Sequence, residues 1–294
     1  MNIPIIHEIG LALRNLNSND VRAIAERRLV LGILALDEAV CERMLTFLLP
    51  VGTSDAKRRE AAGHLLRIAS EEHFHHCEVG LSEPGLPHPE HFYPFDPYTP
   101  SRSIAALLEN QEDLWLPLGR CFPGLRDAVN EKIIWKISKE NTLFTVATAV
   151  PNLVPSWITV PWAVGEFASD TAFLTMNQVR MAFLIAAASD AEIGYQAQKA
   201  QIGSIIAAAF GWRALAREAV SKVPLGGGLV SKGLISFAGT YVVGKSLERF
   251  LRIGRGLTRQ EKREVYSQAY ERGRTVVEQI VNRVRGRVAF AKSA

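Results

Sequence analysis

The sequence predicts a mainly α fold: a small α/β N-terminal unit, then a helical, Ala/Gly-rich domain and a long basic C-terminal helix. Three observations predict it. A short apolar run near the N-terminus is typical of a buried strand. Later segments are rich in alanine and glycine, and the last helical pattern carries an excess of arginine. We expect the first unit over residues 1–100 and the helical domain over residues 101–294.

The N-terminal unit starts with a capped helix and a strand. The capping residues are Asn17, Ser18 and Asp20. They favour a short helix that runs through Arg27. The continuous apolar run 29–35 then predicts a buried strand. Residues 37–49 form an amphipathic pattern that ends at Pro50, as expected for a helix followed by proline.

The next segments predict helices on either side of a linker. A second helix is expected from Ser54 to about Glu72. Residues 83–100 contain six prolines, which predicts an irregular linker. Residues 104–140 are again helical in pattern, with an interruption at residues 122–124, where proline and glycine are adjacent.

Residues 141–165 contain no charged side chain. This segment is long enough to span a bilayer, which needs about 20 residues. Its three prolines, Pro151, Pro155 and Pro161, argue against a straight span. A kinked span, a re-entrant hairpin and a buried connection broken by proline all fit the pattern.

The rest of the helical domain is made of small and apolar residues. Residues 181–188 and 202–210 are apolar almost all round, which is typical of helices buried in protein or in lipid. A helix is expected over 233–249, where Gly239 and Gly244 would allow close contact with a neighbouring helix. The final basic helix is expected over residues 258–287, starting with a Thr258–Glu261 capping box.

Charge is distributed unevenly. Residues 1–100 carry 9 basic and 14 acidic side chains, whereas residues 245–294 carry 13 basic and 5 acidic ones. A basic segment of this kind can meet anionic lipid, nucleic acid or an acidic partner, and it can equally be a solvated helix face. Its basic surface residues are Arg263, Arg272, Arg274, Arg283 and Arg285.

Cysteine usage favours a reducing compartment. The chain has three cysteines, Cys41, Cys77 and Cys121, an odd and sparse set that does not form a disulfide framework. No basic stretch followed by an apolar run marks a secretory signal near the N-terminus.

Two segments match catalytic or metal-binding patterns formally. Residues 239–246 match a P-loop, but they lie inside a predicted helix rather than between a strand and a helix, so we interpret their glycines as a helix contact. Residues 71–78 are dense in Glu, His and Cys, and His88 and His91 would have to complete a metal site. We interpret this segment as an exposed helix end and expect neither a metal nor a cofactor.

Polar residues within the apolar half form the third pattern. Its members are Asp170, Asn177, Gln178, Arg180, Arg213 and Arg217. Because buried charge is costly unless it is paired, a contact between Asp170 and Arg213 or Arg217 would meet that need. We expect a polar network between helices or a partner contact here, and not a catalytic centre. The sequence shows no nucleophile elbow and no nucleic-acid-binding motif.

Residues of about 140–255 resemble a known bacterial family. The markers are Pro161, Gly165, Asp170, Leu174, Asn177, Gln178, Arg180, Met181, Gly194, Tyr195, Lys222, Pro224, Gly226, Gly227, Gly228, Gly239, Thr240, Tyr241 and Gly244. In combination they resemble the YcjF-like domain of unknown function, which is often fused to, or found with, Era-like small GTPases.

The resemblance implies a helical, membrane-associated domain linked to GTPase systems and implies no catalytic residues. Fused members carry a P-loop, whereas the run 29–35 is followed here by Leu36-Asp37-Glu38-Ala39. The N-terminal unit would then be a degenerate GTPase-like fold without its phosphate site. We expect a non-enzymatic accessory or scaffold protein at the cytoplasmic face of the inner membrane, with a possible small GTPase partner and a possible homo-oligomer. The alternative is a soluble helical regulatory module that binds a small GTPase.

Overall fold

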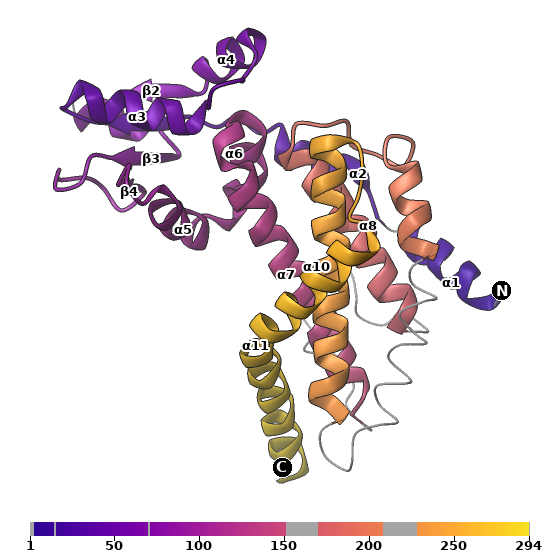
Figure 1. The fold of residues 1–294 in the computed structure, drawn as a ribbon. Helices are drawn as coiled ribbons and strands as arrows, with labels where there is room; N and C mark the ends of the chain where they lie inside the picture. The colour runs from indigo at the N-terminus through magenta and orange to yellow at the C-terminus, as the bar shows by residue number, and fades with distance from the viewer. Residues whose placement is uncertain (1–2, 15, 70, 151–169, 208–227, 294) are drawn as a thin grey trace. The chain divides into compact units, whose positions relative to one another are not determined.

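The structure is a computed structural model, and it describes residues 3–14, 16–69, 71–150, 170–207 and 228–293. Within these residues the chain is mainly helical, with a small parallel sheet in its N-terminal part (Figure 1). The predicted fold class is therefore confirmed.

Contacts divide the chain into two compact units that alternate along the sequence. The sheet unit consists of Asn19–Lys132 and Leu184–Ile193, and the helical unit consists of Met1–Ser18, Ile133–Phe183 and Gly194–Ala294. The sequence analysis places a boundary near residue 100, whereas in the structure the helices that follow the sheet, up to residue 132, belong to the sheet unit.

The sheet unit holds all four strands and several short helices. Its elements are α2 (Ser18–Ala25), β1 (Leu31–Leu34), α3 (Glu38–Leu48), α4 (Asp55–Ala62), β2 (Leu65–Arg67), η1 (Glu71–His76), β3 (Val79–Ser82), β4 (Phe92–Pro94), α5 (Pro100–Asn110), η2 (Glu112–Leu114), α6 (Trp115–Cys121) and η3 (Pro123–Leu125). The strands are parallel, in the order β2-β1-β3-β4.

Longer helices make up the rest of the described chain. They are α1 (Ile3–Arg14), α7 (Arg126–Thr148), α8 (Asp170–Ala188), α10 (Gly228–Ile253) and α11 (Arg259–Ser293), with a further helical stretch over 199–207. Both α7 and α8 contribute residues to each of the two units. The interruption predicted at residues 122–124 is confirmed, because α6 ends there and η3 precedes α7.

The first strand and helix form where the sequence predicts them. Strand β1 is buried along most of its length. The Asp37 side chain then caps α3 by accepting a hydrogen bond from the Ala39 N–H at 2.8 Å. The apolar face of α3 buries Met44 and Leu48 completely. The helix ends just before Pro50, whose ring is incompatible with a continuing helix.

The prediction of a long helix from Ser54 to about Glu72 is wrong. Ser54 does cap a helix, accepting from the Lys57 N–H at 3.2 Å, but α4 ends at Ala62. After Gly63 the chain enters β2, in which Leu65 pairs with Leu31 of β1. A strand of three residues is too short to show the alternation of polar and apolar residues that marks a strand in sequence.

The prediction that residues 83–100 form only an irregular linker is also wrong. The segment contains β4, which pairs with β3 so that Gly80 lies opposite Phe92. Pro94 is tolerated because β4 is an edge strand, where a missing N–H removes no ladder bond. The segment ends at Pro100, the first residue of α5, a position that favours proline.

Two glycines allow one aromatic ring to cover the sheet. A Cβ on Gly80 would lie 2.1 Å from Phe92 Cε1, and a Cβ on Gly32 would lie 2.5 Å from Phe92 Cζ. The Phe92 ring is thus packed directly on the backbone of two strands and is 1 % exposed. It joins Ile68 and Cys77 in a buried cluster of the sheet unit.

The helical unit has two apolar clusters. One joins α1, α7 and α8 and includes a stacked pair of rings, Phe144 and Phe173, with centroids 3.8 Å apart. The other joins α7, α10 and α11 around Phe237, whose ring meets the Trp135 ring edge-on at 4.9 Å. These contacts explain why the apolar sides of α7 and α8 are buried.

Helices α10 and α11 form an antiparallel hairpin (Figure 1). A Cβ on Gly273 would lie 2.6 Å from the Phe237 ring, and one on Gly233 would lie 2.7 Å from Val277. The buried positions of α11 are Ala269, Gly273, Val277, Val281 and Val284, of which Gly273 and Val277 meet α10 directly. The Thr258–Glu261 capping box predicted for α11 is confirmed, because each residue's side chain accepts from the other's backbone N–H, at 2.8 and 3.3 Å.

Candidate functional site

A buried polar network links three helices of the helical unit. Asn141 on α7 accepts a hydrogen bond from Asn177 Nδ2 of α8 at 2.9 Å, and its own Nδ2 donates to Thr240 Oγ1 of α10 at 2.9 Å. Gln178 Nε2 also approaches Thr240 Oγ1, at 3.5 Å. Asn141 and Asn177 are fully buried, and Thr240 is 2 % exposed. One donor–acceptor chain therefore crosses the core from α8 to α10.

An ion pair between Arg180 and Glu140 extends the network to side chains that are less buried. Arg180 of α8 donates to Glu140 Oε2 of α7 at 3.1 Å, and Asn177 donates to the same oxygen at 3.1 Å. The side chains of Arg180 and Glu140 are 14 % and 18 % exposed. Pairing and hydrogen bonding of this kind offset the cost of partly burying the two charges.

The structure brings together some of the predicted polar residues. Asn177, Gln178 and Arg180 belong to the network. Asp170 is the first residue of α8, and Arg213 and Arg217 lie outside the described residues, so the predicted Asp170 pairs stay predictions. Glu140 and Asn141, the partners that α7 supplies, were not among the polar residues predicted from the sequence.

The helix-contact glycines lie in the middle of α10, which is helical throughout the segment that matches a P-loop. Gly239 is buried. A Cβ on Gly244 would lie 2.7 Å from Ile134 and 3.1 Å from the Met181 sulfur. The absent side chain thus lets α10 approach both α7 and α8 closely, as the helix-contact interpretation expects.

The segment dense in Glu, His and Cys, residues 71–78, forms η1 and the two residues that lead into β3. The Cys77 thiol lies in the apolar cluster of the sheet unit and donates to the His73 carbonyl at 3.8 Å. Burial raises the pKa of Cys77 to about 11, so the thiol stays protonated at neutral pH. Among the described residues, no three His, Cys, Asp or Glu side chains converge as a metal site.

The carboxyl ends of β1 and β3 meet at the point where the strand order reverses, which is where open parallel sheets usually bind ligands. Here the Glu83 carboxylate accepts hydrogen bonds from the backbone N–H groups of Leu36 and Asp37, at 2.8 and 3.0 Å. The Asp37 carboxylate in turn accepts a hydrogen bond from the Ala39 N–H. The protein's own carboxylates thus occupy the amides that a phosphate would use at this position.

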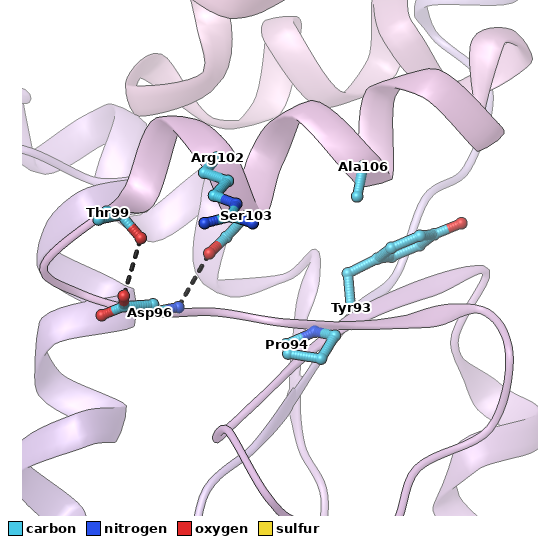
Figure 2. Close-up of a pocket in the computed structure, with 7 residues that line it drawn as sticks. All are labelled: Tyr93, Pro94, Asp96, Thr99, Arg102, Ser103 and Ala106. Carbon is cyan, nitrogen blue, oxygen red and sulfur yellow. Dashed lines mark hydrogen bonds between the residues drawn. The ribbon is translucent and has the colours of Figure 1, made fainter.

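A shallow hollow of about 320 Å³ lies where β4 leads into α5 (Figure 2). It is lined by Tyr93, Pro94, Asp96, Thr99, Arg102, Ser103 and Ala106. The Asp96 carboxylate accepts from the Tyr98 N–H and the Thr99 hydroxyl, which holds the pKa of that carboxyl below its usual range. The Asp96 N–H in turn donates to Ser103 Oγ at 2.9 Å.

The hollow brings binding groups together but no evident catalytic pair. Its lining residues supply one guanidinium, from Arg102, and no imidazole, amine or thiol that would activate the Ser103 hydroxyl. The sequence analysis missed it because residues 83–100 were interpreted as a linker. The run from Asp96 to Pro100 did offer a signal, since Asp two residues before a turn and Pro at a helix start are typical of a helix N-terminus.

The predicted basic surface residues of α11 are exposed. They are Arg263, Arg272, Arg274, Arg283 and Arg285. Arg272 is held in place, because its guanidinium lies 5.4 Å from the Trp135 ring centroid and donates to the Tyr241 hydroxyl at 3.3 Å. That residue contributes to packing between helices as well as to surface charge.

The sheet unit contains a charge cluster around the end of α8. Asp190 has a positive φ of 60°, and the Ala191 N–H donates back to the Ala186 carbonyl at 2.9 Å, which closes the helix as a Schellman motif does. Lys57, only 10 % exposed at its side chain, donates to Asp190 at 2.7 Å. Arg120 and Arg126 each lie 3.7 Å from the same carboxylate.

Comparison of the chain with family models, with curated proteins and with solved structures gave no match.

Proposed function

We propose that this chain is a membrane-associated accessory or scaffold protein of a GTPase-linked bacterial system, acting at the cytoplasmic face of the inner membrane without catalysis of its own. The observation that carries the proposal is the surplus of basic charge on the α10–α11 hairpin. Residues 245–294 hold 13 basic and 5 acidic side chains. Basic residues near an anionic lipid surface are each attracted by about 1 kcal/mol.

The described helices favour attachment at the surface over a bilayer span. One described helix has the length and composition to cross a membrane, Thr171–Ala188 in α8, and 83 % of that window is buried inside the protein. From the uncharged segment 141–165, the residues up to Thr148 belong to α7, where Phe144, Val146 and Ala147 are buried. Insertion of residues 151–165 stays a prediction, because they lie outside the described residues.

The chemistry of the described sites supports a role without catalysis. The polar groups of the network form hydrogen bonds with one another across α7, α8 and α10. These bonds specify how the three helices pack. The Glu83 carboxylate holds the amides at the switch point of the sheet, which supports a degenerate GTPase-like unit that does not bind nucleotide. The link to a GTPase system is drawn from the resemblance of residues of about 140–255 to the YcjF-like domain.

The test is sedimentation of the purified full chain with lipid vesicles. We expect binding to vesicles that contain phosphatidylserine, no binding to vesicles of phosphatidylcholine alone, and release between about 0.1 M and about 1 M salt, because the Debye length falls from about 10 to about 3 Å. A chain that stays in the supernatant with both vesicle types at low salt contradicts the membrane role.

The alternative is a soluble helical regulatory module that binds a small GTPase. The burial of α8 and the internal hydrogen bonding of Asn141 and Asn177 favour it, since both are typical of a protein core. Under this alternative the chain does not bind vesicles. It co-purifies without detergent with a partner protein, and denaturing that partner releases guanine nucleotide. A chain that elutes alone and monomeric contradicts this alternative.

A further inference from the structure

Most of the surplus basic charge lies at one end of the α10–α11 hairpin. Residues 245–263 carry seven basic and two acidic side chains, a net charge of +5. Residues 264–293, the rest of α11, carry six basic and three acidic side chains, a net charge of +3, over a longer stretch. Residues 245–263 comprise the end of α10, the connecting residues and the first turn of α11, and they are called the turn below. The turn therefore has more positive charge per residue than the rest of α11.

The turn is held in a defined conformation. Gly254 has a φ of 75°, which L side chains rarely adopt, and its N–H donates to the Phe250 carbonyl at 2.8 Å. The Ser246 hydroxyl accepts from the Leu257 N–H at 3.1 Å. The capping box then starts α11 at once. The side chains of the turn are thus presented on a rigid support rather than on a loose loop.

The acidic residues of the turn are already engaged. Glu248, only 6 % exposed at its side chain, pairs with Lys245 and lies 3.7 Å from Arg252. Glu261 pairs with Arg249 at 2.6 Å and lies 4.0 Å from Arg255. The remaining cations of the turn, Arg259, Lys262 and Arg263, are exposed and have no ionic partner among the described residues.

An exposed apolar side chain lies between two of the basic residues along the chain. Ile253, the last residue of α10, is 51 % exposed. Arg252 and Arg255 flank it, with side chains 56 % and 58 % exposed. An exposed apolar residue flanked by basic ones fits an anionic lipid surface, where the cations meet headgroups and the apolar group enters the interface.

The outer side of α11 is less suited to such a surface. Glu264, Glu271 and Glu278 are exposed and spaced by seven residues, so they form one stripe along the helix. At 3.6 residues per turn, this stripe lies away from Gly273 and Val277, which face α10. A membrane lying along α11 on its outer side would bring three glutamates to anionic lipid.

We propose that the lipid contact is the α10–α11 tip, defined as Ile253 with Arg252, Arg255, Arg259, Lys262 and Arg263, and not the length of α11. The inference depends on the proposed membrane role and specifies its contact. The tip attracts anionic headgroups through its cations, and Ile253 enters the interfacial region of the bilayer.

The first experiment compares two triple variants of the full chain in vesicle sedimentation with phosphatidylserine present. Arg259→Gln/Lys262→Gln/Arg263→Gln removes three tip charges, and Arg274→Gln/Arg283→Gln/Arg285→Gln removes the same number further along α11. At about fivefold per charge, the tip variant should lose on the order of 100-fold in partition coefficient at low salt. The distal variant should lose clearly less. Circular dichroism checks that both stay helical.

The second experiment reports insertion directly. All three native cysteines are buried, so Ile253→Cys can be labelled selectively with an environment-sensitive dye. Ser267→Cys, at an exposed position on α11, is the matched control. Addition of phosphatidylserine vesicles should shift the emission to the blue at position 253 and leave it unchanged at position 267.

The outcomes separate this inference from the proposed function. A wild-type chain that binds no anionic vesicle overturns the membrane role together with the tip. If the wild-type chain binds and the distal variant loses as much affinity as the tip variant, the membrane role stands and the proposed contact at the tip is wrong. An emission shift at position 267 that equals the shift at position 253 also overturns the tip and favours contact along α11.

Discussion

The hydroxyl of Thr240 gives the sharpest test of the buried network. Replacing it in Thr240→Val keeps the side-chain shape but removes the acceptor of Asn141 Nδ2, which lies 2.9 Å away in a fully buried position. Leaving a buried donor without a partner costs about 1–3 kcal/mol. We therefore expect the free energy of opening the helical unit to fall by about 2 kcal/mol.

The chain offers a matched control on α8. Thr175 is 1 % exposed, and its hydroxyl has no hydrogen-bond partner among the residues that the structure describes. Thr175→Val makes the same chemical change at a buried site but removes an unsatisfied group instead of a satisfied one. Its stability should be unchanged or higher by up to about 1 kcal/mol, because no donor or acceptor loses its partner.

Native-state hydrogen exchange read on peptides of α7, α8 and α10 measures both variants locally, which avoids assuming that the two units unfold together. A loss of about 2 kcal/mol accelerates exchange roughly 30-fold, since each 1.4 kcal/mol is tenfold. Unchanged exchange in Thr240→Val, or an equal loss in Thr175→Val, would refute the claim that the network stabilises these helices through its hydrogen bonds.

Further predictions concern packing, cysteine reactivity and acid stability. Gly124→Ala should destabilise the sheet unit by several kcal/mol in urea unfolding, because its Cβ would lie 1.7 Å from the Phe47 carbonyl oxygen. Gly63→Ala, in the same unit, is the control, because the nearest described atom to its Cβ would be the Glu60 carbonyl oxygen at 3.3 Å. All three cysteines should react slowly with maleimide at pH 8 until urea is added, since burial raises the pKa of Cys77 and of Cys121 to about 11. Hydrogen bonds from Thr258 lower the pKa of Glu261. The ionised Glu261 carboxylate should therefore stabilise the folded chain above the unfolded pKa of 4.5, and this stabilisation should be lost as the pH falls through the lower pKa of the folded state. In Glu261→Gln, helicity should consequently depend less on pH at the acid end of a titration.

Features set by neighbouring residues could be predicted from the sequence. The Thr258–Glu261 capping box, the end of α3 before Pro50 and the buried run that contains β1 all follow from contacts within a few residues. The helix-contact role of Gly244 was also predictable, because its neighbours along α10 are helical and apolar.

Features that depend on distant partners could not be predicted. Strands β2 and β4 have three residues each, and they are strands because β1 and β3 offer them partners. A short pattern of this kind also fits a helix or a loop. The partner must be known before the strand can be recognised.

The polar network shows the same division. Asn177, Gln178 and Arg180 stand out as polar residues in an apolar helix, so the sequence marks them. Asn141 does not stand out, because it opens an uncharged segment, and Glu140 ends a stretch in which charged residues are frequent. Both contact Asn177 of α8, which lies 37 positions after Glu140 and 36 positions after Asn141. Helical periodicity carries no information about a contact at this separation.

The charge cluster at the end of α8 has a consequence for how the chain folds during synthesis. Asp190 is the shared counter-charge of Lys57, Arg120 and Arg126, yet it belongs to a segment, Leu184–Ile193, that follows the rest of the sheet unit by about 50 residues. At about 5–20 residues per second, the ribosome adds that segment roughly 3–10 s after Lys132. Until then Glu60 is the one described carboxylate that pairs with the nearly buried Lys57. The sheet unit should therefore reach its native packing late, and a fragment that stops at Lys132 should be a poor substitute for it.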